Sequence, residues 1–371
     1  MKGRVVVLKE YAEPFAIEEY DVPDPAPGDA LLRITQAGIC GSDLHSWRGD
    51  RDQRYHPIPP SGNVMGHEGT GVLAKLGEGV TTDWAGRSIA EGDRVVHWSS
   101  RACFRCRQCN RGNTNLCTRP PAKYPPEAGV WPYFSGTFAD YLYITADRPF
   151  YRVPDELPDA SLSWVNCAMG TSAEGLDRAG CGPGDYVVVQ GAGGLGLCAT
   201  AIATYRGAAK VIVLDRLPER LELARQFGAD HVINVDEIDT AAARRECILD
   251  LTGGEGADVV MELVGVTELI PEGVEYLGPA GTLVEIGHVM AGRTFTLDPR
   301  RIIRGKRLVG SSGYRHTLIP ALMDLMAKTQ AHIPYERVVS NRFSLDDVNE
   351  AMAAAEWSGR STSVTRAVLV P

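Results

Sequence analysis

Four cysteines lie within fifteen residues of this chain, close enough in sequence to bind one metal ion. Three of them follow at intervals of three positions and the fourth comes eight positions later: Cys103, Cys106, Cys109 and Cys117. Four thiolates suit zinc, which accepts a tetrahedral set of sulfurs and has no redox chemistry of its own. Because such a site leaves no position open, the segment of about 103–117 is predicted to be a structural zinc lobe.

Two other interpretations of this cluster are weaker. Four separate core thiols would need apolar surroundings, but the residues between them are mainly Arg, Gln, Asn and Gly. The bacterial ferredoxin pattern of an iron–sulfur site begins in the same way, yet it continues with three residues, a cysteine and a proline. Here seven residues separate Cys109 from Cys117, and a threonine, Thr118, stands in place of the proline, so zinc is favoured.

A second set of metal-ligand residue types is spread along the chain. Cys40 lies in the segment Gly38-Ile-Cys-Gly-Ser-Asp-Leu-His45, His67 lies in Gly66-His-Glu-Gly69, and Cys167 comes one hundred residues after His67. Two cysteines and one histidine, with a fourth position open, form a known type of catalytic zinc site. Spacing over such distances does not identify ligands. Core thiols, and a hydrogen-bonded pair of His67 with Glu68, therefore stay open as alternatives at this point.

A glycine-rich turn lies between two strand-like runs, Tyr186–Gln190 and Lys210–Asp215. It reads Gly-Ala-Gly-Gly-Leu-Gly over 191–196, and helical composition follows over 197–206. This is the dinucleotide-binding pattern, in which the glycines allow a tight turn, approach of a pyrophosphate and close helix packing; they are Gly191, Gly193 and Gly196.

The carboxylate at the end of the second run predicts which dinucleotide binds. Asp215 lies nineteen residues after Gly196, where it would accept hydrogen bonds from the adenosine ribose and repel a 2′-phosphate. NAD is therefore predicted over NADP, with the adjacent Arg216 acting against that preference.

The elements around these motifs fall into two patterns. After the glycine turn, strand-like runs alternate with helical ones, which predicts a doubly wound α/β sheet of six strands; the further strands are His231–Val235, Asp258–Val264, Thr282–Gly287 and Arg307–Ser311, and the helices include Pro218–Phe227 and Glu237–Leu251. Before residue 155, short β-rich runs broken by Pro and Gly predict a barrel-like β domain; they are Val5–Leu8, Ala30–Thr35, Gly71–Leu76 and Arg94–Trp98. The tail adds two helices and a strand: Ile319–Lys328, Leu345–Ala355 and Ala367–Val370.

Composition limits the classes of function. A chain of 371 residues with 44% hydrophobic and 23% charged residues is expected to fold as two globular domains. Its net charge of −9 argues against nucleic-acid or anionic-membrane partners, and no apolar run is long enough to span a bilayer. The N-terminus has no secretory pattern, so we expect a cytoplasmic protein whose nine cysteines serve as metal ligands or free thiols.

Taken in order, the motifs resemble the zinc-containing medium-chain alcohol dehydrogenase family over essentially the whole chain. The resemblance also includes three further segments: Gly136-Thr-Phe-Ala-Asp-Tyr141, the run from Gly256 to Gly265 and the run from Gly278 to Gly287. It implies a discontinuous GroES-like β-rich catalytic domain, residues 1–167 and 312–371, and a Rossmann NAD-binding domain, residues 168–311. The substrate would then lie between the two domains.

The resemblance also implies roles for single residues. Cys40, His67 and Cys167 would hold a catalytic zinc, which makes two zinc ions per chain with the four-cysteine lobe. Asp43 would orient His67, and Glu68 would approach the zinc. Ser42 would hydrogen-bond the substrate alcohol, and His45 would pass its proton to solvent.

Four weaker cofactor contacts follow from the same resemblance. Arg220 would contact the adenosine ribose, Arg366 the pyrophosphate, and Thr171 and Leu195 the nicotinamide. Gly41 differs from family members with a basic residue at that place, which weakens the expected grip on the pyrophosphate. The predicted reaction is hydride transfer between an alcohol and NAD, in a homodimer or homotetramer, with a small-molecule alcohol or carbonyl compound as substrate.

Two other functions stay open at this point. One is a zinc-independent, NADPH-dependent quinone or enoyl reductase, and the other is a zinc-lobe interaction protein with a vestigial nucleotide fold. An anionic substrate is a further possibility because basic residues lie in two loops, although solvated loop arginines are the commoner case; the residues are Arg48, Arg51, Arg54, His56, His97 and Arg101.

Overall fold

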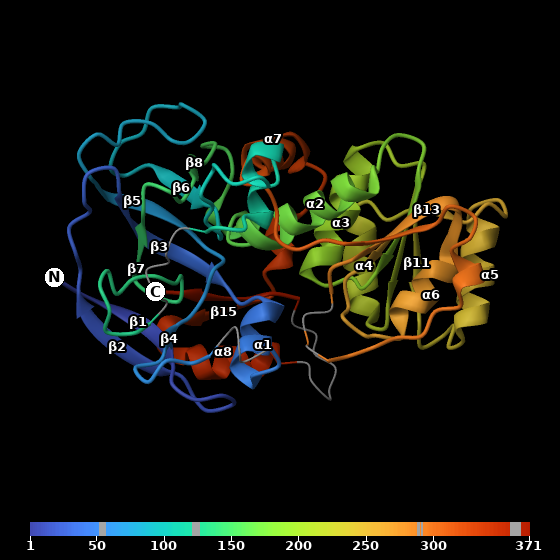
Figure 1. Cartoon of the computed structure of the whole chain (residues 1–371), viewed down its shortest axis with the longest axis horizontal. Coiled ribbons are helices and arrows are strands. Elements are labelled where there is room, and N and C mark those ends of the chain that lie inside the picture. Colours follow the sequence, from blue (N-terminus) through green and yellow to red (C-terminus); the bar gives the residue numbers. More distant parts are fainter. Residues whose placement is uncertain (52–56, 121–126, 288–289, 291, 357–364) are drawn as a thin grey trace. The chain divides into compact units, whose positions relative to one another are not determined.

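The computed structural model describes residues 1–51, 57–120, 127–287, 290, 292–356 and 365–371. The chain forms two compact units. The first contains residues 1–170, 313–328 and 335–371, and the second contains residues 171–312 and 329–334. Both termini belong to the first unit (Figure 1). The predicted domain limits, 1–167 with 312–371 and 168–311, stay predictions beside these units.

The first unit is built from β-strands, as the Pro- and Gly-broken runs predict. A three-stranded sheet has the order β2-β1-β4, and a seven-stranded sheet has the order β15-β16-β3-β5-β6-β8, with β7 also paired to β3. The strands are β1 (Lys2–Leu8), β2 (Ala16–Asp21), β3 (Ala30–Gly38), β4 (Asn63–Val64), β5 (Thr70–Leu76), β6 (Arg94–His97), β7 (Tyr141–Ile144), β8 (Phe150–Arg152), β15 (Asn341–Ser344) and β16 (Ala367–Val370).

The C-terminal strand, β16, lies between β15 and β3 in the seven-stranded sheet. In the antiparallel pairing of β16 with β3, Val368 lies opposite Gly38 and Leu369 opposite Ala37. The last residues of the chain therefore lie beside the end of β3, two residues before Cys40. A buried core of aliphatic and aromatic side chains, including Leu32, Phe138 and Leu369, packs against these strands.

Among the described residues, four helices belong wholly or mostly to the first unit. They are α1 (Gly41–Arg48), the single π-helical turn η4 (Val165–Met169), α7 (Leu318–Thr329) and α8 (Val348–Ala355). Short 3-10 turns complete the unit: η1 (Cys109–Arg111), η2 (Thr114–Leu116), η3 (Asp159–Ser161), η6 (Tyr335–Val338) and η7 (Leu345–Asp347). The turn η4 was not predicted, because one widened helical turn leaves no periodic pattern in the sequence.

The second unit contains the doubly wound parallel sheet that the sequence predicts. Its six strands have the order β11-β10-β9-β12-β13-β14. Their bounds are β9 (Tyr186–Gln190), β10 (Lys210–Asp215), β11 (His231–Asn234), β12 (Ala257–Glu262), β13 (Leu277–Glu285) and β14 (Arg307–Gly310). The reversal of strand order between β9 and β12 is typical of dinucleotide-binding folds.

Of the three helices predicted for this unit, one begins earlier than composition indicates, one begins later and one begins at the predicted residue. The helices of the unit are α2 (Gly170–Ala179), α3 (Gly194–Tyr205), α4 (Pro218–Gln226), α5 (Ala241–Leu251) and α6 (Leu269–Tyr276), with the 3-10 turn η5 (Pro299–Arg301). The predicted start of α5 at Glu237 is wrong because the Thr240 hydroxyl caps the helix by accepting from Ala243 N. Among the described residues, no helix is long and apolar enough to cross a membrane.

Candidate functional site

Helix α1 positions the first cysteine of the candidate site. Cys40 is the N-cap of α1, and its own N–H donates to the Asp43 carboxylate at 2.9 Å. This capping contact fixes Cys40 at the positive end of the helix dipole, where a thiolate is stabilised. The other Asp43 oxygen lies 3.1 Å from His67 Nδ1. Since a carboxylate only accepts, Nδ1 carries the proton and Nε2 is left as the ligand atom.

Glu68 lies next to Cys40 and His67 in the candidate site. The side chain is fully buried, and both carboxylate oxygens accept from Arg366 Nη1, at 2.8 and 2.9 Å. Arg366 also donates to the carbonyl of Ile39. A glycine at position 38 makes room for the carboxylate, because an added Cβ there would lie 2.3 Å from Glu68 Oε2.

Cys167 reaches the same place from the turn η4. Its sulfur lies 3.8 Å from Cys40 Sγ and 3.3 Å from His67 Nε2. The ligand atoms of these three residues and of Glu68 all lie within 4.8 Å of one another. Donors bound at about 2.3 Å in a tetrahedron are about 3.8 Å apart. The three residues therefore fit a zinc ion by distance and by chemistry.

The two thiols of this site differ in acidity. Hydrogen bonding from Cys167, and then His67, holds the pKa of Cys40 well below its ordinary range. The hydrogen bond to Cys40, together with burial, raises the pKa of Cys167. One thiolate and one thiol are thus expected without metal, and a bound dication would favour deprotonation of both.

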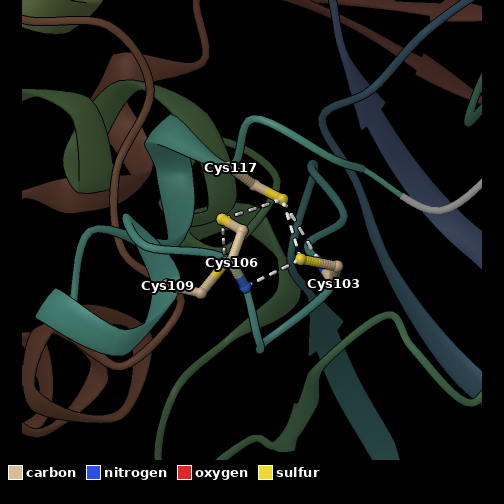
Figure 2. Close-up of side chains that lie close together, drawn as sticks. All are labelled: Cys103, Cys106, Cys109 and Cys117. Atoms are coloured by element: carbon tan, nitrogen blue, oxygen red, sulfur yellow. Dashed lines mark hydrogen bonds between the residues drawn. The ribbon is translucent and has the colours of Figure 1, made fainter.

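The four cysteines of the lobe point toward one another (Figure 2). Their sulfurs lie 3.5 Å apart for Cys106 and Cys109, 3.5 Å for Cys103 and Cys117, and 4.0 Å for Cys106 and Cys117. Backbone N–H groups also donate to sulfur, from Cys106 to Cys103 and from Cys103 to Cys117, both at 3.3 Å. All nine cysteines lie in described segments, and none forms a disulfide. The lobe fits a structural zinc.

The predicted relay residues lie on α1. Ser42 is half-buried and follows Cys40 by two positions, and His45 is half-buried one turn further along. The Nδ1 atom of His45 lies 2.8 Å from Asp50 Oδ2 and 2.9 Å from Arg48 Nη2. Neither Asp50 nor Arg48 was predicted as a partner of His45. Both lie within five residues of His45 in the sequence, and this short interval could have indicated the contact.

The predicted glycines and the predicted carboxylate of the cofactor site lie at the carboxyl ends of β9 and β10, in the second unit. Gly191 and Gly193 lie in the turn between β9 and α3, and Gly196 lies in the first turn of α3, where an added Cβ would lie 1.8 Å from the carbonyl of Gly191. Asp215 ends β10, and its carboxylate accepts from Ala192 N at 2.7 Å.

Three further predicted cofactor residues lie in the same unit. Thr171 begins it, Leu195 lies in the first turn of α3, and Arg220 lies in α4; all three side chains are half-buried. A hydrogen bond from the Ser172 hydroxyl to the Leu195 carbonyl, 2.8 Å long, joins α2 to the first turn of α3. Arg366, by contrast, belongs to the first unit and binds Glu68 there, so its contact with pyrophosphate stays a prediction.

Two of the loop arginines considered for anion recognition are engaged in ion pairs. Arg48 donates to Glu356 at 2.7 and 2.8 Å, and Arg101 donates to Asp147 at 2.5 to 3.0 Å. His97 is fully buried, and burial lowers its pKa to about 3. The expectation of solvated loop arginines is therefore wrong for Arg48 and Arg101. Arg54 and His56 lie outside the described residues.

Comparison with known proteins agrees with this geometry. Residues 26–155 match the alcohol dehydrogenase GroES-like domain, and residues 194–328 match the zinc-binding dehydrogenase domain. A 5-exo-hydroxycamphor dehydrogenase from Pseudomonas putida is 35% identical over 91% of each chain. An L-threonine 3-dehydrogenase from Anaeromyxobacter sp. (strain K) is 32% identical over 93% of each chain. A crystal structure of an alcohol dehydrogenase from Thermotoga maritima is 25% identical, with a TM-score of 0.90 over 100% of both chains.

The GroES-like and Rossmann-like parts, together with the two cysteine-containing clusters, define a nicotinamide-dependent oxidoreductase of the two-domain type. More narrowly, the chain belongs to the zinc-containing medium-chain alcohol dehydrogenase family, whose members interconvert alcohols and carbonyl compounds. The predicted family, fold and oxidoreductase class are confirmed. This result argues against an interaction protein, and the metal-ligand cluster at Cys40 argues against a zinc-independent reductase.

Proposed function

We propose that this chain is an NAD-dependent alcohol dehydrogenase with two zinc ions. The catalytic zinc would be held by Cys40, His67 and Cys167, and the structural zinc by the four-cysteine lobe. The observation that carries the proposal is the convergence of the three ligand atoms and of a Glu68 oxygen within 4.8 Å. When bound, zinc would supply Lewis acidity that favours ionisation of an alcohol, and NAD would supply the hydride acceptor.

The chain's own residues then hold and move the proton. Ser42, two residues after Cys40, would accept the hydroxyl hydrogen of the alcohol. His45 is three residues further along the same helix and would pass that proton to solvent. Asp43 keeps His67 in the tautomer that presents Nε2. Glu68 stays paired with Arg366 through two hydrogen bonds.

The second unit supplies the proposed dinucleotide site. Gly191, Gly193 and Gly196 leave the backbone open to a pyrophosphate, and the N-terminus of α3 favours its negative charge. Asp215 keeps unused lone pairs for ribose hydroxyls after accepting one backbone hydrogen bond per oxygen, from Ala192 and Leu217. Arg216, which could attract a 2′-phosphate, lies 3.1 Å from Asp236. These contacts support NAD over NADP.

A secondary or functionalised alcohol is the proposed substrate class. The names of two relatives denote enzymes for a ring alcohol, 5-exo-hydroxycamphor, and for the 3-hydroxyl of L-threonine. Both hydroxyls are borne by secondary carbons. Assembly as a homodimer or homotetramer and a cytoplasmic location stay predictions from the sequence.

Metal content and turnover test the proposal together. Wild-type enzyme should contain two zinc ions per chain and reduce NAD with secondary alcohols, followed as NADH absorbance. Cys40→Ser should lose one zinc and turnover but still bind NAD, and Cys247→Ser, in α5, is the matched control. Wild-type rates in Cys40→Ser enzyme that lacks the second zinc would contradict the proposed site.

A further inference from the structure

Asn166 connects two proposed ligand segments that are far apart in the sequence. It precedes Cys167 in the turn η4 and is fully buried. Its amide nitrogen donates to the backbone carbonyl of His67 at 3.2 Å, and its amide oxygen accepts from Gly69 N at 3.3 Å. The same side chain therefore grips the backbone on both sides of Glu68.

The orientation of this amide is fixed by its third contact. The nitrogen also lies 3.2 Å from His97 Nε2. His97 Nδ1 lies 3.0 Å from the carbonyl of Trp98, so Nδ1 must donate and Nε2 must accept. A flipped amide would place its oxygen against two acceptors, His97 Nε2 and the His67 carbonyl. Both hydrogens and the oxygen of the amide are thus used in one orientation only.

These contacts are part of a closed hydrogen-bonded ring. The Tyr314 hydroxyl donates to the backbone carbonyl of Asn166, and the indole Nε1 of Trp98 donates to the backbone carbonyl of Tyr314 at 3.1 Å. Trp98 then leads back to Asn166 through His97. The four residues are at most 2% exposed, so each of these bonds is protected from competition with water.

Close packing holds the ring against the turn that carries Cys167. An added Cβ at Gly170 would lie 2.6 Å from the Tyr314 ring. The tyrosine therefore packs directly on the backbone three residues after Cys167. This arrangement restrains the backbone on both sides of the cysteine, at Asn166 and at Gly170.

We propose that Asn166 is a positioning residue of the catalytic zinc site. Its amide sets the separation of Cys167 from the His67 segment, and His97 and Tyr314 hold Asn166 in place. This inference rests on the proposed function, because it needs zinc at Cys40, His67 and Cys167. Residues that orient metal ligands through backbone or side-chain contacts typically change metal affinity by about 10- to 100-fold when they are replaced.

The test is the rate at which purified holoenzyme releases zinc to an excess of a colorimetric chelator. In Asn166→Ala, one of the two zinc equivalents should leave on the order of 10- to 100-fold faster than in the wild type. The other equivalent should keep the wild-type rate, which makes the lobe an internal control. Cys40→Ser, with zinc at the lobe alone, identifies the phase that belongs to the lobe.

A near-isosteric variant separates hydrogen bonding from packing. Asn166→Asp keeps the size of the side chain and an acceptor for Gly69, but it loses both donors. It should also release a single zinc equivalent faster. If the Asn166 variants are not obtained as folded holoenzyme, Tyr314→Phe removes one hydroxyl of the ring and should accelerate release of the same equivalent by several-fold.

The zinc content of the wild type and the release rates of the variants distinguish the possible outcomes. Wild-type enzyme with zinc only at the lobe would contradict the proposed function together with the role of Asn166. Wild-type enzyme with two zinc ions, and Asn166 variants that release both at wild-type rates, would overturn the role of Asn166 alone. Equally faster release of both zinc equivalents would also overturn it, because that result would mean that the substitution loosens the whole fold and not one metal site. If Tyr314→Phe released zinc at the wild-type rate, the proposal that the Tyr314 hydroxyl helps to hold Asn166 in place would be overturned.

Discussion

The Nδ1 atom of His45 lies between an acceptor and a donor, 2.8 Å from a carboxylate oxygen of Asp50 and 2.9 Å from a guanidinium nitrogen of Arg48. A carboxylate only accepts and a guanidinium only donates. Nδ1 therefore has a partner both when it carries a proton, which faces Asp50, and when it does not, in which case it accepts from Arg48. A relay histidine needs both neutral tautomers, and this arrangement supplies a hydrogen bond for each.

The two neighbours of His45 should move the pH profile in opposite directions. Burial is the largest cause that lowers the pKa of His45, Arg48 also lowers it, and Asp50 raises it. In the proposed relay His45 accepts a proton and must be neutral to do so, so kcat/KM should fall as the pH drops through this pKa. Asp50→Asn removes the raising effect and should shift the acidic limb to lower pH. Arg48→Gln should shift it to higher pH.

The kcat/KM profiles of these variants, measured from pH 5 to 9 with saturating NAD, check the prediction. His45→Gln is the control, because it removes the titrating group and should remove this limb altogether. Shifts in the same direction for Asp50→Asn and Arg48→Gln, or an unchanged limb in His45→Gln, would contradict a relay through His45.

Loss of one lobe cysteine should affect stability more than chemistry. Cys106→Ser removes one of four sulfurs that lie within 4.8 Å of one another, and we expect one zinc per chain in place of two. Cross-linking a loop of about fifteen residues is worth about 3 kcal/mol, so the free energy of unfolding should fall by an amount of that order. Urea unfolding and metal analysis measure both effects. Cys247→Ser should change neither, and a two-zinc Cys106→Ser enzyme would refute the lobe assignment.

Cofactor preference should depend on Asp215. A charge-assisted hydrogen bond is worth about 1.5–3 kcal/mol, so Asp215→Ser should lower kcat/KM for NAD by roughly 10- to 100-fold. The same change removes the repulsion of a 2′-phosphate, and kcat/KM for NADP should rise. Asp236→Ala releases Arg216 but leaves Asp215 in place, so it should keep most of the NAD preference. Steady-state kinetics with both cofactors decide the question, and an Asp215→Ser enzyme with unchanged preference would contradict the ribose contact.

The elements that sequence reasoning places well are those bounded by motifs. Strands β9 and β10 match their predicted limits because unbroken apolar runs end at a glycine turn and at Asp215. Helix α6 (Leu269–Tyr276) was missed because it contains Pro271, which usually interrupts a helix. Pro271 is tolerated there because it lies in the first turn, where the backbone N–H groups have no partner within the helix.

The candidate site could be predicted from the sequence less completely than the secondary structure. The types of Cys40, His67 and Cys167 indicated zinc, but only the fold brings Cys167 to within 3.3 Å of His67 Nε2. Asn166 carried no signal at all, since a single asparagine belongs to no motif. Its role depends on contacts to His67 and His97, which are 99 and 69 residues away in sequence. Contacts of that separation follow from the tertiary fold and cannot be inferred from local pattern.

A pair of carboxyl groups should make the stability of the second unit depend on pH. Glu262 and Glu285 lie opposite each other at the ends of β12 and β13, and Glu262 is fully buried. Burial first, and then the charge of Glu285, raises the pKa of Glu262 from 4.5 to about 8. One Glu262 oxygen also accepts from Val264 N and Gly265 N at 2.9 Å, which fixes the turn after β12.

The sign of this dependence follows from proton binding. Between about pH 4.5 and 8 the folded state keeps a proton on Glu262 that the unfolded state has lost, so the free energy of unfolding should fall as the pH rises. The slope from this group is at most about 1.4 kcal/mol per pH unit. Glu262→Gln stays neutral and keeps the acceptor for Val264 and Gly265, and it should therefore be more stable than wild type at pH 9 and lose the slope. Urea unfolding of both proteins at several pH values measures the difference, with the exposed Glu255→Gln as control. Parallel curves for wild type and Glu262→Gln would show that Glu262 is ionised in the folded state.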